Sequence, residues 1–219
     1  MVSHDFSGRV VLVTGSEGGI GKATASAFAR GGATLLLVDL AEADEAECAR
    51  LTKLGAVAAV AFACDISDEA AIARLVEEVL ERFGRIDVIV NIAGAMIYRS
   101  VAEMSADDWN RMLSINLVGP ALLTGAGLRH MSSGGSIVNV ASIHVRQTTA
   151  DVAGYAAAKA GICSVTRTAA IEGKPKGIRV NAVGPGSVQT NMLAGVAEDK
   201  AALATIHSRT PLGRIAHPD

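Results

Sequence analysis

A short apolar run that leads directly into a glycine-rich turn is the feature of this sequence that most restricts its fold. Residues 10–14 read Val-Val-Leu-Val-Thr, and four of the next seven residues, 15–21, are glycines. Glycines between a strand and a helix let the backbone approach a pyrophosphate that lies at the helix N-terminus. The pattern predicts a strand, a tight turn and a helix that bind a dinucleotide. A simple tight turn is the alternative interpretation.

The rest of the chain repeats this alternation of short β-branched runs and longer alanine-rich segments. We expect strands at residues 9–14, 34–40, 57–63, 86–90, 136–141 and 178–183. We expect helices at about residues 20–30, 43–54, 68–83, 105–131 and 152–171. The strands are almost continuously apolar, which is typical of a parallel sheet covered by helices on both faces.

Right-handed crossovers between such strands predict an α/β fold with a Rossmann-type, doubly wound parallel sheet of at least six strands. The arrangement has three layers, αβα, and ligands gather at the carboxyl ends of the strands. Neither an internal repeat nor a linker interrupts residues 1–219, so we expect a single domain.

Charge and cysteine content restrict the partners. The formal net charge is −2 and lysine and arginine form no cluster, which argues against nucleic acid and anionic membranes. The three cysteines are widely spaced, which is typical of reduced thiols, and the five histidines lack metal-site spacing. The N-terminus lacks the features of a signal peptide. We expect a soluble, cytoplasmic protein without a metal, whose partners are small molecules or copies of itself.

Two acidic residues indicate which dinucleotide binds. Asp39 ends the second expected strand, where this fold places the carboxylate that binds the adenosine ribose. Its carboxylate can accept hydrogen bonds from the ribose hydroxyls but would repel a 2′-phosphate. Glu17 lies within the glycine turn, where phosphate recognition would favour a basic group. We therefore expect NAD(H) rather than NADP(H), with Asp39 as a simple helix cap as the alternative.

Tyr155 and Lys159 stand four residues apart in an alanine-rich stretch that should be helical, so both lie on one helix face. A fixed positive charge beside a phenol lowers its pKa toward neutrality. The pair predicts a proton donor. An ordinary helix with one aromatic residue and one solvated lysine is the alternative.

A series of motifs, taken in order, makes the chain resemble the short-chain dehydrogenase/reductase family in its classical subgroup. They are Thr14-Gly-Ser-Glu-Gly-Gly-Ile-Gly21, Asn91-Ile-Ala-Gly94, Asn116, Ser142, Tyr155-Ala-Ala-Ala-Lys159 and Pro185-Gly186. The likeness covers nearly all of the residues. The glycine turn combined with a downstream serine and the Tyr-x-x-x-Lys pair is far more specific than either motif alone.

The resemblance implies a catalytic tetrad and a cofactor site. In the tetrad, a tyrosine exchanges the proton, a serine fixes the substrate oxygen, a lysine holds the nicotinamide ribose, and an asparagine positions a water. Its members are Asn116, Ser142, Tyr155 and Lys159. The implied cofactor contacts are Gly15, Glu17, Gly19, Ile20, Gly21, Asp39, Leu40, Asp65, Ile66, Asn91, Ala93, Gly94, Tyr155, Lys159, Pro185, Gly186, Val188 and Thr190.

The chain departs from the family pattern in two places. Ile92 replaces the second asparagine of the usual Asn-Asn-Ala-Gly, for which we expect local repacking without loss of activity. Beyond Asp219 the family normally continues through one more helix and a final strand, so we expect a sheet without them, either in a fragment or in an unusual protein.

The substrate is the least determined feature. Candidate substrate contacts are Met96, His144, Val152 and Ser187, and residues at about 190–210 should form a lid. We expect an NAD(H)-dependent oxidoreductase that transfers a hydride between nicotinamide and a small secondary alcohol or ketone, such as a polyol, sugar or hydroxy acid. The alternatives are a 3-oxoacyl-[acyl-carrier-protein] reductase and a catalytically inactive dinucleotide-binding regulator. The resemblance also suggests a homotetramer.

Overall fold

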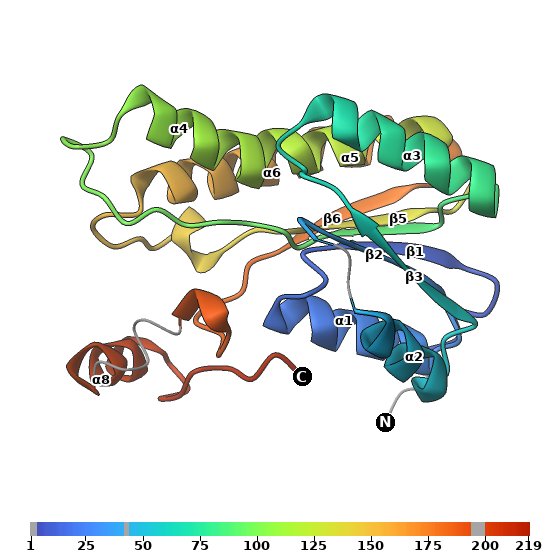
Figure 1. The fold of residues 1–219 in the computed structure, drawn as a ribbon. Helices are drawn as coiled ribbons and strands as arrows, with labels where there is room; N and C mark the ends of the chain where they lie inside the picture. The colour runs from blue at the N-terminus through green and yellow to red at the C-terminus, as the bar shows by residue number, and fades with distance from the viewer. Residues whose placement is uncertain (1–3, 42–43, 194–199) are drawn as a thin grey trace.

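The computed structural model describes residues 4–41, 44–193 and 200–219. Within these residues, one parallel sheet of six strands follows the order β3-β2-β1-β4-β5-β6 (Figure 1). The strands are β1 (Val10–Thr14), β2 (Thr34–Asp39), β3 (Ala58–Ala63), β4 (Val88–Asn91), β5 (Ser136–Val140) and β6 (Arg179–Val183). The direction of winding reverses between β1 and β4, where ligands bind in doubly wound sheets. The predicted fold class is confirmed.

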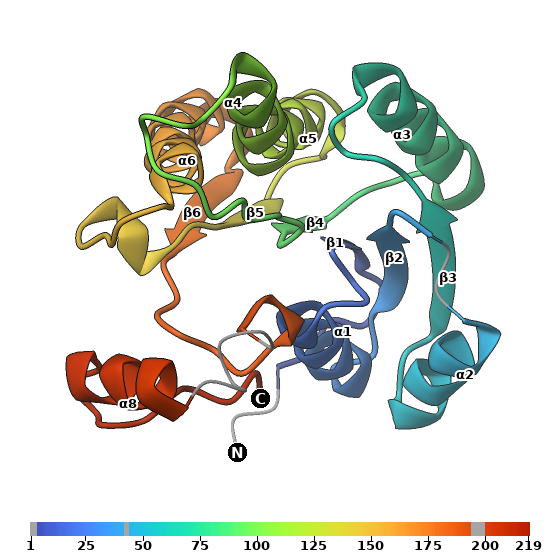
Figure 2. The same cartoon turned by 60° about the vertical axis from the view of Figure 1, so that its left-hand side comes forward.

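Helices cover both faces of the sheet (Figure 2). One face carries α3 (Glu69–Phe83), α4 (Ala106–Leu113), α5 (Gly119–His130) and α6 (Ala153–Glu172), and the other carries α1 (Gly19–Arg30) and α2 (Glu45–Leu54). Along β1, Leu12 packs into the core beneath α3 and α5, whereas Val11 and Val13 pack against α1 and α2. Alternate residues of the strand are therefore buried on opposite faces, which explains its continuous apolar sequence.

The single helix predicted at residues 105–131 is wrong in its middle. A capping box between Ser105 and Asp108 starts α4, but a π-helix, η1 (Ser114–Val118), separates α4 from α5. A Cβ on Gly119 would lie 2.1 Å from the carbonyl oxygen of Ile66, and Pro120 has no N–H to donate. The helix widens where both constraints meet, and π turns of this kind are frequent at functional sites.

Short turns and one further helix complete the described chain. They are the 3-10 turns η2 (Ile143–Val145), η3 (Lys174–Lys176) and η4 (Asn191–Leu193), and the helix α8 (Lys200–Arg209). The predicted lid includes η4 and α8, whereas its residues 194–199, like the helix start predicted at residue 43, fall outside the described residues. Throughout the described ranges, every helix is too short or too polar to span a bilayer.

Candidate active site

The glycine turn after β1 packs closely against the end of β4. Gly15 has a φ of +66°, and a Cβ there would lie 2.7 Å from the backbone nitrogen of Ala93. Thr14 fixes the same contact, because its Oγ1 accepts hydrogen bonds from the backbone nitrogens of Ile92 (3.0 Å) and Ala93 (3.2 Å). A Cβ on Gly21 would lie 2.0 Å from the Gly15 carbonyl oxygen. The turn can therefore keep this shape only with glycine at both positions.

Asp39 joins the end of β2 to the glycine turn. One carboxylate oxygen accepts a hydrogen bond from the backbone nitrogen of Glu17 (3.0 Å) and the other from that of Leu40 (2.8 Å). The cap of α2 is Asp44, whose side chain accepts from the backbone nitrogen of Ala46. Asp39 is thus not the helix cap, and each of its oxygens retains capacity to accept a ribose hydroxyl.

The residues of the turn fit a dinucleotide. Ser16 Oγ is buried without a hydrogen-bond partner among the described residues, and a ribose or phosphate oxygen can satisfy it. Gly18, the N-cap of α1, supplies no side-chain cap, so N–H groups at this helix end can bind an anion. A Cβ on Gly186 would meet nothing within 4 Å, so the opposite loop leaves open space.

Three of the implied cofactor contacts, Leu40, Asp65 and Ile66, follow the ends of β2 and β3. Asp65 Oδ1 accepts hydrogen bonds from the backbone nitrogen (2.8 Å) and the hydroxyl (2.7 Å) of Ser67. Ile66 is buried, whereas Leu40 is exposed, and Ile20 is partly buried in the first turn of α1. An exposed Leu40 beside Asp39 is placed where an apolar base could cover it.

Asn116 connects the π turn to the segment that follows β4. Its side chain is fully buried, and Nδ2 donates to the carbonyl oxygens of Ala95 (2.9 Å) and Met112 (3.0 Å). Its Oδ1 accepts from the backbone nitrogen of Ala95 (3.3 Å). A Cβ on Gly94 would lie 2.8 Å from Asn116 Oδ1 and 3.6 Å from Lys159 Nζ. The structure therefore brings Asn116, Gly94 and Lys159 together.

Lys159 is a buried cation at the carboxyl end of β5. The residue is 3% exposed, and Nζ donates to the carbonyl oxygen of Val140 (2.8 Å). Burial lowers the pKa of Lys159 to about 8, and Cys163 acts weakly in the opposite direction. Lysine is seldom buried without an anionic partner, and such a group in a crevice is typical of a functional site.

Tyr155 lies one helical turn before Lys159, and its phenol is buried. Burial raises the pKa of Tyr155, a hydrogen bond with the Ser142 side chain lowers it, and Tyr98 raises it further. The net direction is upward, so the predicted lowering by Lys159 is wrong for the protein by itself. The physical reason is that desolvation, with Tyr98, outweighs the lowering by Ser142, and no lowering by Lys159, whose Nζ lies 5.6 Å from the centroid of the tyrosine ring, is resolved.

Ser142 and His144 lie next to each other, and His144 packs against Tyr155. Ser142 Oγ accepts a hydrogen bond from the backbone nitrogen of His144 (3.2 Å). The rings of His144 and Tyr155 pack edge to face with centroids 5.9 Å apart, and His144 Nδ1 hydrogen-bonds Thr148 Oγ1 (3.2 Å). Burial lowers the pKa of His144, so the imidazole is neutral near pH 7.

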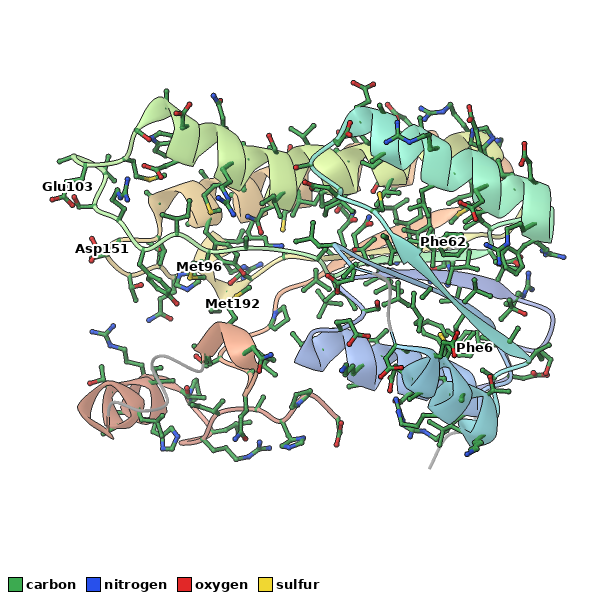
Figure 3. All side chains as sticks on the ribbon, in the orientation of Figure 1. Phe6, Phe62, Met96, Glu103, Asp151 and Met192 are labelled. Carbon is green, nitrogen blue, oxygen red and sulfur yellow. The ribbon has the colours of Figure 1, made fainter. Side chains whose placement is uncertain are left out.

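Two other candidate substrate contacts, Val152 and Met96, differ in their surroundings. Val152 is 2% exposed and bridges to Arg99, so its side chain belongs to the core. Met96 lies on the segment after β4 and Met192 on η4 (Figure 3). Asp151 has a φ of +65°, which is uncommon for a residue other than glycine, and it directly precedes Val152.

The loop of residues 185–190 is held from two sides. The carbonyl oxygen of Pro185 accepts from the backbone nitrogen of Ile143 (2.9 Å), beside Ser142. Val188 forms a parallel bridge with Ala216, whose backbone nitrogen donates to the Ser187 carbonyl oxygen (3.0 Å). A Cβ on Gly19 would lie 2.9 Å from Thr190 Cγ2, so the loop reaches the glycine turn. No sequence signal predicts the contact with Ala216.

A buried polar network beneath the site was also missed by sequence reasoning. Asn91 Nδ2 donates to Asn139 Oδ1 (2.7 Å), and Asn139 Nδ2 donates to Thr166 Oγ1 (2.9 Å). Thr124 Oγ1 donates to the same Asn139 oxygen (3.3 Å). The network joins β4 and β5 to α5 and α6, so the Asn91 side chain stabilises the sheet end that carries the site. Ile92, the departure from the family pattern, packs against the core beside α1.

Comparisons with known proteins agree with this geometry. The family model described as Enoyl-(Acyl carrier protein) reductase matches residues 15–219. The cis-4-hydroxycyclohexanecarboxylate dehydrogenase of Sinomonas cyclohexanicum is 40% identical over 98% of this chain and 86% of its own length. The D-threitol dehydrogenase of Mycolicibacterium smegmatis is 39% identical over 100% of this chain and 85% of its own. The 3-oxoacyl-[acyl-carrier-protein] reductase FabG of Thermotoga maritima is 36% identical over 98% of this chain and 87% of its own length.

The chain belongs to the short-chain dehydrogenase/reductase family and is an oxidoreductase of that family. An NAD+-bound xylitol dehydrogenase superposes with a TM-score of 0.86 at 30% identity, covering 97% of this chain and 88% of its own. A Beutenbergia cavernae protein assigned as an NAD(P)-dependent gluconate 5-dehydrogenase, with bound NADP, superposes with a TM-score of 0.89 at 34% identity. The match covers 98% of this chain and 86% of that protein. The family thus binds a nicotinamide dinucleotide, and both forms occur among its members.

Proposed function

We propose that this enzyme uses NAD(H) to interconvert a small, polar secondary alcohol and its ketone, the alcohol being a polyol, a sugar or a hydroxy acid. The observation that carries the proposal is that Ser142, Tyr155 and Lys159 lie together near the carboxyl end of β5, with Lys159 Nζ close to Gly94 on the segment that packs against the glycine turn. The relatives support the substrate class, because those named for cis-4-hydroxycyclohexanecarboxylate and D-threitol act on small hydroxylated molecules.

Tyr155 is the proposed general acid and base. The nicotinamide ring of bound NAD(H) would supply the hydride acceptor or donor. The Tyr155 hydroxyl would exchange the matching proton with the substrate oxygen, and Ser142, whose side chain lowers the pKa of Tyr155, would hold the oxygen in place. His144, packed on the Tyr155 ring, would contact the part of the substrate next to the reacting carbon.

Lys159 and Asn116 are proposed to support this proton transfer. Lys159 would hold the nicotinamide ribose and stabilise the phenolate, because its cation lies on the same helix face as Tyr155. Asn116 would position a water through which the proton reaches solvent; the closeness of Asn116 and Lys159 to Gly94 supports this role.

The preference for NAD(H) is proposed from Asp39 and Glu17. Glycines 15, 19 and 21 would let the pyrophosphate approach the backbone, and Asp39 would accept hydrogen bonds from the adenosine ribose. Val188 and Thr190 would hold the nicotinamide carboxamide. We expect Asp39→Ala to raise kcat/KM with NADPH relative to NADH by about tenfold, because a carboxylate beside the 2′ position is removed. The matched control is Asp44→Ala, which removes an exposed carboxylate that caps α2. An unchanged ratio in Asp39→Ala would contradict this cofactor assignment.

The remaining predictions belong to the same proposal. Residues 1–219 would act as one dinucleotide-binding domain in which η4 and α8 are part of a substrate lid at about residues 190–210. A homotetramer and a cytoplasmic location rest on the family resemblance and the composition. Light scattering after gel filtration and cell fractionation test these two predictions.

A carrier-protein substrate is the second candidate, because one relative and the family model carry such names. Asp39, Glu17 and the net charge of −2 argue against it, since an acidic carrier favours a basic surface. We expect a panel of polyols, sugars, hydroxy acids and ketones, assayed by the absorbance of NADH, to contain a substrate. Turnover only with acyl-carrier thioesters would favour the second candidate, and binding of NADH without any turnover would favour the inactive regulator.

A further inference from the structure

A cation that the sequence did not identify as part of the nucleotide site lies directly beside the glycine turn. Lys22 lies in the first turn of α1, and its Nζ is 3.0 Å from Glu17 Oε2. The Lys22 and Glu17 side chains are 46% and 37% exposed, so the ion pair lies on the solvent-accessible side of the turn. An ammonium is therefore present at the place where a phosphate group of the cofactor would be recognised, but it is already paired.

Glu17 lies between this cation and Asp39. Its backbone nitrogen donates to Asp39 Oδ2 (3.0 Å), while its side chain pairs with Lys22. The remaining carboxylate oxygen, Glu17 Oε1, is buried and has no partner among the described residues. Two carboxylates, of Glu17 and Asp39, and the ammonium of Lys22 thus lie close together at the turn, so the local charge is negative.

We propose that Glu17 masks Lys22, and that this ion pair is a second determinant of coenzyme choice, independent of Asp39. The proposal rests on the proposed function only in placing the adenosine half of a dinucleotide at this turn. A 2′-phosphate carries nearly two negative charges and needs an unpaired cation. Lys22 can serve as that cation only after the Glu17 carboxylate is removed, because Glu17 neutralises it and leaves the negative charge of Asp39 unopposed.

The test measures binding of the adenosine half alone, without turnover. Calorimetric titrations of the full chain use 5′-AMP, which lacks a 2′-phosphate, and adenosine 2′,5′-bisphosphate, which has one. The variants are Glu17→Gln, Glu17→Ala, Lys22→Gln and the double variant Glu17→Gln/Lys22→Gln. Glu17→Gln keeps the size of the side chain and removes only its charge. Thermal unfolding of each variant establishes that it is folded.

We expect both Glu17 variants to bind the bisphosphate about tenfold more tightly than the original protein does, relative to 5′-AMP. The double variant should lose this gain, because the gain depends on the released ammonium. The bisphosphate gain should also fall as salt is raised. No gain in either Glu17 variant, or a gain that persists in the double variant, would overturn the proposal. Binding of neither ligand to any protein would instead contradict the proposed dinucleotide site.

Discussion

Two buried charges at opposite ends of the sheet are held in very different ways. Asp87, at the amino ends of the strands, is 4% exposed and accepts hydrogen bonds from the backbone nitrogen of Val10 and from the side chains of Arg9 and Arg85. Burial acts to raise the pKa of Asp87, but the bonds from Arg85, Val10 and Arg9 hold it below its usual value.

Lys159, at the carboxyl ends of the strands, is equally buried but has a neutral partner. Its Nζ donates to the Val140 carbonyl oxygen, and burial lowers its pKa to about 8. A buried charge with several charged partners can stabilise a fold, whereas one with a single neutral partner is costly and typical of a site. The comparison indicates that the amino ends serve stability and the carboxyl ends serve chemistry.

Among the substitutions that test this comparison of the two buried charges, Lys159→Met has the largest expected effect. We expect kcat to fall about 1000-fold, because the proposed support for the Tyr155 phenolate is lost. We also expect the free energy of unfolding at pH 7 to rise by roughly 1–3 kcal/mol, since a buried ammonium is replaced by an apolar side chain of similar length. Steady-state kinetics and urea unfolding measure the two effects.

The pH dependence of this stability gain follows from the direction of the pKa shift. The folded-state pKa of Lys159, about 8, lies below the unfolded value of ~10.4, so the penalty is complete below the folded pKa. As pH rises between the two values, the penalty disappears and the variants should converge. Lys53→Met, at an exposed position in α2, is the control and should show no such gain. A Lys159→Met protein less stable than the original would break the comparison.

Asp87→Asn should have the opposite consequences. We expect the free energy of unfolding to fall by about 2 kcal/mol, because the ion pairs of Asp87 with Arg9 and Arg85 are lost. This loss is smaller than that for a fully buried ion pair, because both arginine side chains are about half exposed. The folded pKa of Asp87 is lowered, so its contribution is present above about pH 4 and disappears as pH falls through the folded pKa. The kcat of the folded enzyme should be unchanged.

Glu78→Gln is the matched control for Asp87→Asn. It breaks an exposed ion pair between Glu78 and Arg82 within α3, so it should change stability by less than about 0.5 kcal/mol. Equal effects of the two substitutions in urea unfolding, or a large loss of kcat in Asp87→Asn, would mean that the amino ends are not specialised for stability.

The smallest expected effect is on the pH profile of alcohol oxidation. Because burial raises the pKa of Tyr155, the phenolate form should increase with pH through the alkaline range. We expect kcat/KM for the alcohol to rise by at most about tenfold per pH unit above neutrality. Measured initial rates that are flat from neutral to alkaline pH would indicate another base.

The sheet and most of the site could be predicted from sequence because they depend on local patterns. The run at residues 10–14, the glycines after it and the spacing of Tyr155 and Lys159 each report a local geometry. The π turn at Asn116 could not be predicted, because it depends on the contact of Gly119 with Ile66, far along the chain.

The pKa direction of Tyr155 and the masking of Lys22 were missed for the same reason. Sequence spacing shows that a cation is near a phenol, but the depth of burial that raises the pKa of the phenol is a tertiary property. Spacing likewise places Lys22 next to Gly21 without showing that its ammonium turns back to Glu17. The bridge of Val188 to Ala216 joins two irregular segments that have no periodic signal.

The assignment of Tyr155 as the proton-transferring group is tested most directly by single-turnover hydride transfer in Tyr155→Phe. The substitution removes the hydroxyl, whose pKa the Ser142 side chain lowers, and leaves the buried ring in place. We predict that NADH fluorescence reports nearly unchanged binding, while the rate of hydride transfer falls about 1000-fold or more. A rate within about tenfold of the original enzyme, with NADH still bound, would contradict the assignment.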